Sequence, residues 1–397
     1  MQRPPLDGIR VLDLSRILTG PFCSMILSDL GAEVIKVEMP GSGDDTRHWP
    51  PMVQDESSYY MAINRNKKSI TLNLKTEEAK QALYKIAEKC DVVLENFRPG
   101  VTKRLGVDYE ELKKINPKLV YCSISSYGQT GPYSQLPGYD MIVQGMSGIM
   151  SITGSPDGPP YRSGLAITDI GAGMWAALSI VSAIRQRDSS GEGQYLDVSM
   201  LDCATSWLTS FAGNYFATGV SPSRLGNAHF GIVPYQNFEA NDGKHLLLAV
   251  GNDKLFAALS NEMELPALIS DPMFSTAPKR AENREILVPI LAKRFKVRSR
   301  DEWVVALRGC GVPCGPINSI SEILGDEHLL GRDMVTQVKH PTLNEVKQLN
   351  FPVKFSDTEL KIRSHPPMLG ENTVEILSEL AGFDDEQIRL MKEKNAI

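Results

Sequence analysis

Residues 9–38 read "IRVLDLSRILTGPFCSMILSDLGAEVIKVE" and predict two strands with a helix between them. The segments 9–14 and 33–38 have the pattern of strands, and the segment from Pro21 to Gly31 has that of a helix. Proline suits the first position of a helix and glycine its C-terminal cap, so Pro21 and Gly31 mark the two ends. A strand, a helix and a strand in this order predict a parallel βαβ unit.

The same alternation continues through the first third of the chain. It predicts strands at 69–74, 91–97 and 118–125, and helices at 76–90, capped by Thr76, and at 109–115. Together these elements predict an α/β fold with a Rossmann-like parallel sheet. The segment after the first strand reads "SRILTGP" and not G-x-G-x-x-G, so binding of NAD or FAD loses its main support.

The rest of the chain predicts long loops and a second, smaller domain. Residues 130–165 are rich in Gly, Pro and Ser, and 194–208 predict a strand that runs into a helix. The stretches "GKHLLLAVG" and "RDEWVVALRGCG" predict a smaller α/β region near 226–325. Residues 371–394 predict two helices.

Composition bounds the class of protein. The chain has 397 residues, 42% of them hydrophobic and 23% charged, as is ordinary for a water-soluble globular protein. A net charge of −6 offers no general attraction to nucleic acid or to acidic membranes, so we expect neither as a partner. The N-terminus lacks the apolar core of a signal peptide, and the uncharged run from Ile170 to Ile184 is shorter than a membrane span. We expect a cytoplasmic protein, or a mitochondrial-matrix protein if a targeting peptide has been removed.

Cysteines, histidines and short motifs exclude several chemistries. The 6 cysteines are scattered, which predicts reduced thiols, and the Cys310/Cys314 spacing is not that of a zinc ribbon. None of the 6 histidines has a metal-ligand spacing, so we expect no metal. The absence of a P-loop and of a G-x-S-x-G elbow argues against a P-loop NTPase and a serine hydrolase.

Basic residues gather in two segments of the predicted sheet. Arg65, Lys67 and Lys68 precede one predicted strand, and Arg98 and Arg104 follow another. Ligands bind at the carboxyl ends of strands in open parallel sheets, and Lys and Arg recognise phosphate. We therefore expect a phosphorylated ligand there, although any one of these cations could simply be a solvated surface charge.

A single acid interrupts the apolar stretch "GLAITDIGAGMWAALSIVSAI" at 164–184. Asp169 lies where we expect a helix to begin, and Gly171 and Gly173 follow it. The ordinary interpretation is an N-cap that binds free amides of the first turn. The alternative is a carboxylate nucleophile.

The blocks of the chain resemble those of the class III CoA transferases, which include formyl-CoA transferase and carnitine CoA transferase. The similar blocks are "LDLSRILTGPFCSMILSDLGAEVIKVE", "GSGDDTR", "NRNKKSITLNL", "ENFRPG", "SSYGQTGPY", "GYDMIVQGMSG" and "TDIGAGMWAA". They cover nearly the whole chain in order. Three later blocks, "HFGIVPYQNF", "VGNDKLF" and "GVPCGPIN", look most like the succinyl-CoA–glutarate branch.

The resemblance implies an interlocked, ring-like homodimer. Each subunit would have a large Rossmann-like domain built from both chain ends, 1–210 and 326–397, a linker at 211–225 and a small domain at 226–325.

The resemblance also implies the chemistry. It makes Asp169 the nucleophile, which forms a mixed anhydride with the donor acyl group and then an aspartyl-CoA thioester. A carboxylate is already ionised at neutral pH, so it needs no general base. We expect amides near Gly171 to be open for oxyanions, and we expect the CoA thioester to act as substrate with no permanently bound cofactor.

Further site residues follow from the matched blocks. The CoA-binding positions are Arg16, Ile17, Leu72, Asn73, Lys75, Asn96, Phe97, Arg98 and Arg104. Phe97 would pack on the adenine side, with Arg98 and Arg104 near phosphate. Arg47, Tyr59 and Tyr139 would line the active site beside the acyl group; for both tyrosines a core or turn role is the alternative.

Two departures from formyl-CoA transferase bear on the substrate. Leu18 replaces a substrate-facing Gln, and the glycine-rich loop is missing near Gly251, which disfavours oxalate and formate. Succinyl-CoA is the expected donor, and a dicarboxylate such as glutarate the expected acceptor. Arg224, His229 and Asn252 could contact substrate or be surface loop residues.

Three other functions remain open. An α-methylacyl-CoA racemase would need a His base in a G-H-D block, but this chain reads "GYD", and Tyr139 is a weak base at pH 7. A non-catalytic acyl-CoA-binding protein is a second alternative. A dehydrogenase is a third, weakened by the missing fingerprint.

Overall fold

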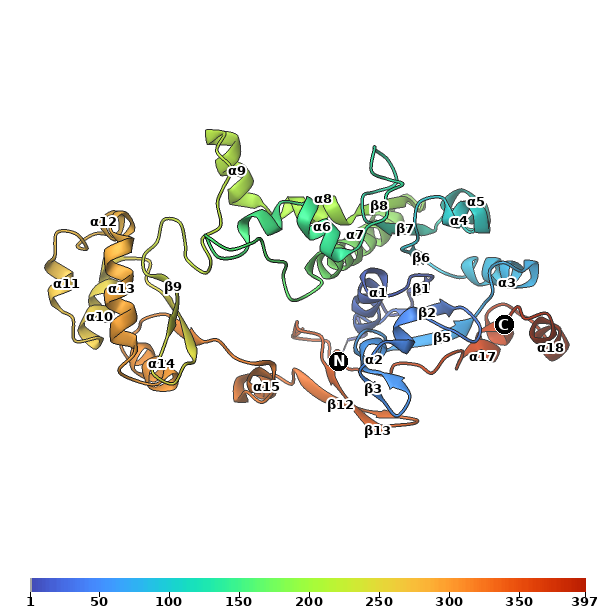
Figure 1. Ribbon diagram of the computed structural model, residues 1–397. Helices are drawn as coiled ribbons and strands as arrows, with labels where there is room; N and C mark the ends of the chain where they lie inside the picture. The colour runs from blue at the N-terminus through green and yellow to red at the C-terminus, as the bar shows by residue number, and fades with distance from the viewer. Residues whose placement is uncertain (1) are drawn as a thin grey trace. The chain divides into compact units, whose positions relative to one another are not determined.

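The computed structural model describes residues 2–397, which form two units (Figure 1). The first unit contains the chain up to Ile149, Ser163–Ala212 and His328–Ile397. The second contains Met150–Arg162 and Gly213–Glu327. Residues 150–162, predicted within the large domain, and 213–225, predicted as a linker, thus belong to the second unit.

A six-stranded parallel sheet forms the centre of the first unit. Its order is β5-β2-β1-β6-β7-β8, with bounds Lys67–Thr71, Glu33–Glu38, Arg10–Asp13, Val92–Glu95, Val120–Ser125 and Tyr195–Ser199. The register pairs Val11 of β1 with Val34 on one side and with Val92 on the other. The chain runs outward from β1 in both directions, so a topological switch point lies between β1 and β6.

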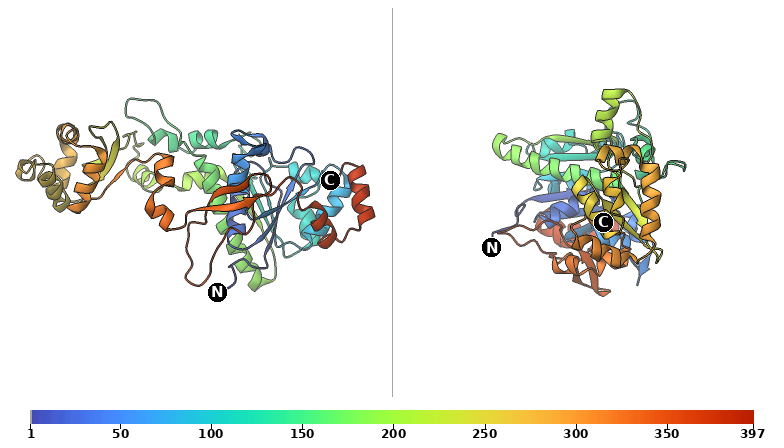
Figure 2. Two further views of the ribbon diagram at one scale, coloured as in Figure 1. Left: turned by 90° about the horizontal axis from the view of Figure 1, so that it is seen from below. Right: turned by 90° about the vertical axis from the view of Figure 1, so that its left-hand side faces the viewer.

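Both faces of this sheet are buried, because neighbouring strand residues point to opposite sides. Val11 packs on one face with Cys23 and Leu27, whereas Leu12 packs on the other with Leu83 and Ile86. The first face is covered by α1 (Thr19–Asp29), α6 (Asp140–Met146), α7 (Ile167–Ser190) and α8 (Met200–Ser206). The second is covered by α3 (Glu77–Ala87), α5 (Tyr109–Ile115), α17 (Thr373–Glu379) and α18 (Asp385–Glu393). Figure 2 shows the C-terminal helices α17 and α18, in red, beside α3.

Short elements complete the first unit. They are the helices α2 (Ser58–Ile63) and α4 (Val101–Leu105), the 3₁₀ turns η1 (Asp45–His48) and η2 (Ile149–Ile152), and the hairpins β3–β4 (Met52–Val53, Glu56–Ser57) and β12–β13 (Val335–His340, Asn344–Leu349). Helices α9 (Thr209–Thr218) and α16 (Glu327–Gly331) lie where the chain passes between the units.

Helix α7 has the length and composition of a membrane span, which the sequence did not lead us to expect. Half of its most apolar window is nevertheless buried inside the protein. Its residues Ala172, Ala176 and Ile180 pack with the sheet and α1, as in a helix of a domain core.

The second unit has its own antiparallel sheet, of order β11-β10-β9 (Cys314–Pro316, His245–Ala249, Tyr235–Glu239). Its helices are α10 (Asp253–Glu262), α11 (Ala267–Ser270), α12 (Ala277–Glu282), α13 (Arg284–Phe295), α14 (Arg300–Gly309) and α15 (Ile320–Leu324). Trp303 and Phe295 are fully buried in its core.

The predicted α/β class and parallel sheet are confirmed. The helix after Thr76 is confirmed with its cap, since the Thr76 hydroxyl accepts a hydrogen bond from the amide of Ala79. The strand predicted at 69–74 instead spans Lys67–Thr71, because Lys67 pairs with Val34 in the ladder.

Candidate active site

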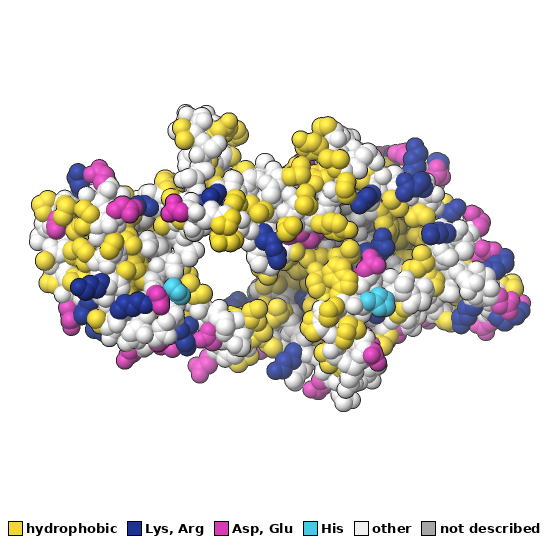
Figure 3. Space-filling view, viewed as in Figure 1, with side chains coloured by type: hydrophobic (Ala, Val, Ile, Leu, Met, Phe, Trp, Pro, Cys, Tyr) yellow, Lys and Arg dark blue, Asp and Glu magenta, His cyan; other side chains and the backbone are white. Residues whose placement is uncertain are grey.

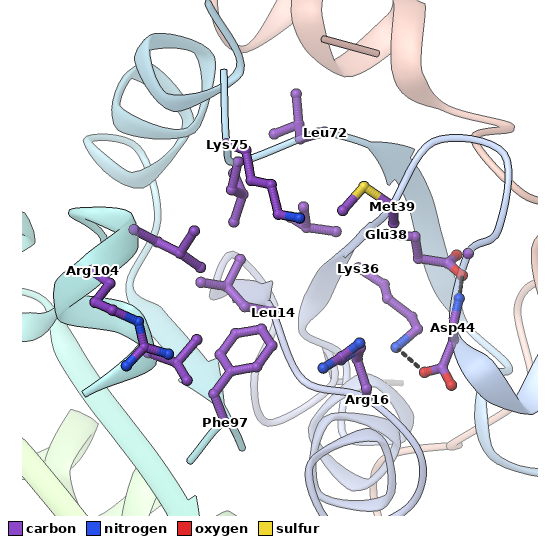
Figure 4. Close-up of a pocket in the computed structure, with 15 residues that line it drawn as sticks. Leu14, Arg16, Lys36, Glu38, Met39, Asp44, Leu72, Lys75, Phe97 and Arg104 are labelled. Carbon is purple, nitrogen blue, oxygen red and sulfur yellow. Dashed lines mark hydrogen bonds and ion pairs between the residues drawn. The ribbon is translucent and has the colours of Figure 1, made fainter. Parts of the chain in front are cut away.

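A cavity of about 420 Å³ opens at the carboxyl ends of four strands of the parallel sheet (Figure 4). Leu14 follows β1, Glu38 ends β2, Leu72 follows β5 and Phe97 follows β6. Strands β1 and β6 flank the switch point, the place in open α/β sheets where the loops diverge and leave room for a ligand.

The cavity combines apolar walls with cations. Its apolar lining includes Leu14, Val37, Met39, Leu72, Leu74, Phe97, Val101 and Leu105. The exposed side chains of Arg16, Lys75 and Arg104 approach it from separate elements, and Arg16 lies 5.3 Å from the centre of the Phe97 ring (Figure 4). This arrangement can accept a flat ring between apolar side chains while three cations meet phosphate groups.

Five of the nine predicted CoA positions line this cavity: Arg16, Leu72, Lys75, Phe97 and Arg104. The other four do not. Arg98 is exposed to solvent, and the Asn73 side chain donates to the carbonyl of Asn395 in the C-terminal segment. Ile17 and Asn96 instead shape the loop that carries Arg16.

Asn96 holds both sides of the Arg16 backbone. Its Oδ1 accepts from the Arg16 amide and its Nδ2 donates to the Arg16 carbonyl, both at 2.8 Å. The next residue, Ile17, has φ +68°, a left-handed conformation that is costly for a β-branched side chain. The Ile17 amide donates to the Asp44 carboxylate at 3.2 Å. The strained turn is therefore held from two directions.

The cations at 65–68 do not form the expected phosphate site. Because β5 begins at Lys67, this segment lies at the amino end of the strand. Arg65 pairs with Asp29, and the Lys67 ammonium is fully buried, where it donates to the carbonyl of Pro21 and to Asn64. Lys68 pairs with Glu33 and Glu375. These cations already have partners within the protein. The cations that remain available to a phosphate group are Arg16, Lys75 and Arg104 around the cavity.

Asp169 lies in the first turn of α7 and is not its N-cap, because the helix begins at Ile167 after Ala166. The Thr168 amide is capped instead by Asp140 of α6, whose Oδ1 accepts it at 2.9 Å. The Asp169 side chain is thus free of the capping role, which was the ordinary interpretation of this acid.

The Asp169 carboxylate is half-buried beside the start of α1. The Thr19 hydroxyl donates a hydrogen bond to Asp169 Oδ1. Burial raises the pKa of Asp169 to about 6; the Thr19 hydrogen bond works to lower this pKa, and the nearby charge of Asp140 to raise it. At neutral pH the group is mainly ionised, yet its charge is poorly solvated, as suits a nucleophile.

The glycines after Asp169 serve packing and not an open set of amides. Both lie inside α7, where their amides belong to the helical ladder, so the expected oxyanion role of Gly171 is corrected. A Cβ on Gly173 would lie 2.7 Å from the carbonyl oxygen of Thr19, and one on Gly171 would overlap Trp207 at 1.9 Å. The glycines let α1 and Trp207, the residue after α8, approach α7, and the approach of α1 at Gly173 brings Thr19 to Asp169.

Replacing Gly173 with alanine is expected to disturb this contact. The added methyl group meets backbone, which cannot rotate away, so α1 must shift and the free energy of unfolding should fall by about 1–3 kcal/mol. Any activity that depends on Asp169 should fall by more than the loss of folded protein explains. Urea unfolding and activity assays on Gly173→Ala measure both; Gly309→Ala, whose Cβ would have no neighbour within 4 Å, is the control. Equal behaviour of the two variants would contradict the role of Gly173.

The three predicted residues near the acyl group have different surroundings. Tyr59 is half-buried against Trp49, and burial together with the charge of Asp169 raises the pKa of Tyr59 to about 12, so it remains a hydrogen-bond donor. Tyr139 is 68% exposed. Arg47 does not face the cavity: it pairs with Glu38 at 2.7 Å and donates to the Tyr60 hydroxyl and the Pro367 carbonyl. Its contacts are those of a residue that supports the fold.

Several residues of the site were missed by sequence reasoning. Thr19 and Asp140 act on Asp169 or its helix, and Asp44 with Lys36 supports the Ile17 turn. The only sequence signal for them was their place inside the matched blocks.

Three residues of the second unit have local partners. Asn252 caps α10 by accepting from the Leu255 amide, and Arg224 donates to the carbonyls of Ser155 and Gly158. His229 Nδ1 accepts from two backbone amides at 3.1 Å, which leaves the proton of its neutral form on Nε2. Within residues 2–397, no group of three or more His, Cys, Asp or Glu side chains is placed to hold a metal ion.

The fold and site define a class: an α/β protein whose cavity at the switch point combines apolar walls with cations, and which carries a half-buried carboxylate, Asp169, at the start of α7. Residues 6–373 match the sequence model of CoA-transferase family III, and the chain belongs to this family of enzymes. It is 42% identical to the mouse succinyl-CoA:glutarate CoA-transferase over 97% of this chain and 88% of that protein. It is 43% identical to the acetyl-CoA:oxalate CoA-transferase of Acetobacter aceti, over 83% of this chain and 85% of that one. A solved CAIB/BAIF family protein from Brucella suis is 42% identical, with a TM-score of 0.88 over 96% of this chain and all of the other.

Proposed function

We propose that this protein transfers CoA from an acyl-CoA, with succinyl-CoA as the donor, to a dicarboxylic acid such as glutarate, through covalent intermediates on Asp169. The observation that carries the proposal is that one loop serves both parts of the site. Arg16 of this loop lines the cavity, and Thr19, three residues later, hydrogen-bonds the Asp169 carboxylate. A thioester whose nucleotide part occupies the cavity would have its reactive end directed along this loop.

The mechanism begins with attack of Asp169 Oδ2 on the thioester carbonyl carbon. The C–S bond breaks, and the products are an aspartyl–succinyl anhydride and CoA thiolate. The thiolate then attacks the aspartyl carbonyl carbon, which releases succinate and leaves an aspartyl-CoA thioester. The acceptor carboxylate repeats these steps in reverse and leaves as a new acyl-CoA, with Asp169 restored.

The names of two relatives bear on the choice of acceptor. The mouse relative is named for glutarate, and the Acetobacter relative for oxalate. Oxalate, disfavoured by Leu18 and by the loop near Gly251, therefore returns to the set of acids to be tested. Glutarate remains our proposed acceptor.

The test is acyl-CoA exchange followed by mass spectrometry. Purified protein is mixed with succinyl-CoA and, separately, glutarate, oxalate, other dicarboxylates and monocarboxylates. We expect glutaryl-CoA to form fastest. Formation of oxalyl-CoA alone would overturn the acceptor, and no exchange with any donor would overturn the transferase mechanism.

The cations of the cavity give a second test. Arg104→Ala and Lys75→Ala should each raise KM for acyl-CoA by roughly tenfold, because each removes a charge-assisted contact to phosphate. KM for the acceptor acid should change little. Lys114→Ala is the control, since the Lys114 side chain is 67% exposed and pairs with Glu111 on the same helix. An unchanged KM for acyl-CoA in both cavity variants would contradict the location of the nucleotide.

We also propose that the protein acts as an interlocked homodimer. Six large apolar side chains of the first unit are exposed on α6 and α7: Met141, Ile142, Met146, Met174, Trp175 and Leu178. Figure 3 shows hydrophobic side chains gathered over these helices. A second copy of the chain would cover such a surface, and light scattering should then give twice the mass of the chain.

A further inference from the structure

Among the described residues, Thr19 is the only side chain that forms a hydrogen bond with the carboxylate of Asp169. Its hydroxyl donates to Oδ1, and within residues 2–397 Oδ2 has no hydrogen-bond partner. The two oxygens of the candidate nucleophile are therefore different: one is held, and the other is left for attack. Thr19 itself is 5% exposed.

Three contacts hold the backbone that carries the Thr19 hydroxyl. Thr19 is the first residue of α1, directly after the turn held by Asn96 and Asp44. The carbonyl of Thr19 faces Gly173 of α7, where only a glycine permits the close approach. The hydroxyl and the carboxylate thus come from two helices whose backbones pack closely at Thr19 and Gly173.

We propose that Thr19 is a catalytic hydrogen-bond donor that stabilises the oxyanion formed on Asp169 itself, an inference that rests on the proposed function. When CoA thiolate attacks the aspartyl carbonyl carbon, the electron pair of that carbonyl moves onto Oδ1, the oxygen that Thr19 already holds. The oxyanion collapses, the bond to the bridging oxygen breaks, and the donor acid leaves as its carboxylate. The same donor serves when the acceptor carboxylate attacks the aspartyl-CoA thioester.

The backbone amides of Gly171 and Gly173 cannot stabilise this oxyanion, because both form hydrogen bonds within the α7 helix. The Thr19 hydroxyl supplies the donor instead. A fixed donor in a half-buried site is worth more than one in water, since it needs no reorganisation when charge develops.

Thr19→Val is the direct test, because valine keeps the branched shape of threonine and replaces its hydroxyl with a methyl group. We expect kcat to fall by about 10²-fold, the usual cost of one lost oxyanion donor. Thr19→Ser, which keeps the hydroxyl, should recover most of that loss. A role in packing alone predicts the opposite order, because serine loses the methyl group that valine retains.

The pH profile gives a second readout. The titratable groups that face Asp169 are Asp140 on α6 and Tyr59 on α2; α1 presents the neutral Thr19, and Trp207, just after α8, lies against Gly171. Without the Thr19 hydrogen bond, the pKa of Asp169 should rise above its value of about 6. The acid limb of the pH–rate profile should shift to higher pH by about one unit in Thr19→Val and stay in place in Thr19→Ser.

Ser28→Ala is the matched control, since Ser28 is a buried hydroxyl on the same helix that binds the Met25 carbonyl, away from Asp169. We expect its rate and pH profile to match the wild type. Exchange by Thr19→Val at the wild-type rate, or with the wild-type acid limb, would overturn the proposal. Absence of exchange in the wild type would instead overturn the proposed function, so the two failures are distinct.

Discussion

Replacing Asp169 with asparagine is expected to reduce CoA exchange by about 10⁴-fold or more. Asparagine keeps the shape and can still accept the Thr19 hydrogen bond, but its amide is not a nucleophile, so neither the anhydride nor the thioester can form. Exchange assays measure the loss. Incubation of the wild type with acyl-CoA should leave CoA attached to the peptide that contains Asp169, as detected by mass spectrometry after digestion.

Asp140→Asn is an informative comparison. Asp140 caps Thr168 at 2.9 Å and faces Asp169, but under our proposal it forms no bond to substrate. Its replacement should lower activity by far less than that of Asp169. A CoA adduct on another residue, or substantial exchange by Asp169→Asn, would contradict the assignment of the nucleophile.

The same Asp169→Asn substitution is expected to stabilise the fold at neutral pH. The pKa of Asp169 is raised from 3.8 to about 6 in the folded state, so the folded protein binds the proton more tightly than the unfolded chain. The stability contributed by Asp169 is therefore greatest below about pH 4 and is lost as pH rises to about 6. Above that range the ionised Asp169 lowers the free energy of unfolding by up to about 3 kcal/mol, and asparagine, which carries no charge, removes this cost. Urea unfolding at pH 5 and pH 8 should show a larger gain for Asp169→Asn at pH 8; an equal gain at both would contradict the linkage.

The sheet could be predicted from the sequence because its signals are local. Alternating strand and helix patterns, with Thr76 as a cap, determine the elements without knowledge of tertiary contacts. The exact start of β5 could not be predicted. A lysine in a strand normally indicates a surface, whereas the Lys67 side chain is fully buried with partners from distant segments, Asp13 and the carbonyl of Pro21.

The site was predictable only in part, for a similar reason. Asp169 was predicted as a nucleophile from a family resemblance, since its own stretch of sequence favoured an N-cap. The Thr168 amide, one residue before Asp169, is capped by Asp140 from another helix, a contact that no local pattern contains. Met39 and Leu74 line the cavity because the ends of their strands are neighbours in the sheet. That arrangement follows from the strand order, which no local pattern contains.

Replacing Lys36 with methionine is expected to be the most destabilising of the substitutions proposed. The Lys36 ammonium is fully buried and contacts Asp44 Oδ2 at 2.9 Å and the Ser15 carbonyl at 2.8 Å. Burial works to lower the pKa of Lys36, but the charges of Asp44, Asp13 and Glu38 outweigh it and raise the pKa above its usual value. Methionine fills the space and leaves these acids without their central cation, at a cost of about 3–5 kcal/mol.

This loss should reach the active site, because Asp44 also holds the strained Ile17 turn before Thr19. Urea unfolding gives the stability, and exchange at a temperature where the variant is folded gives the activity.

Lys68→Met on the adjacent strand is the control: its partners Glu33 and Glu375 are one-third exposed, so its loss should cost less than about 1 kcal/mol. Adding Asp44→Asn to Lys36→Met removes the orphaned charge and should recover part of the stability but not the activity. Equal stability of Lys36→Met and Lys68→Met would show that the buried acids accept a proton at little cost, and the ion pair would then not be what holds the turn.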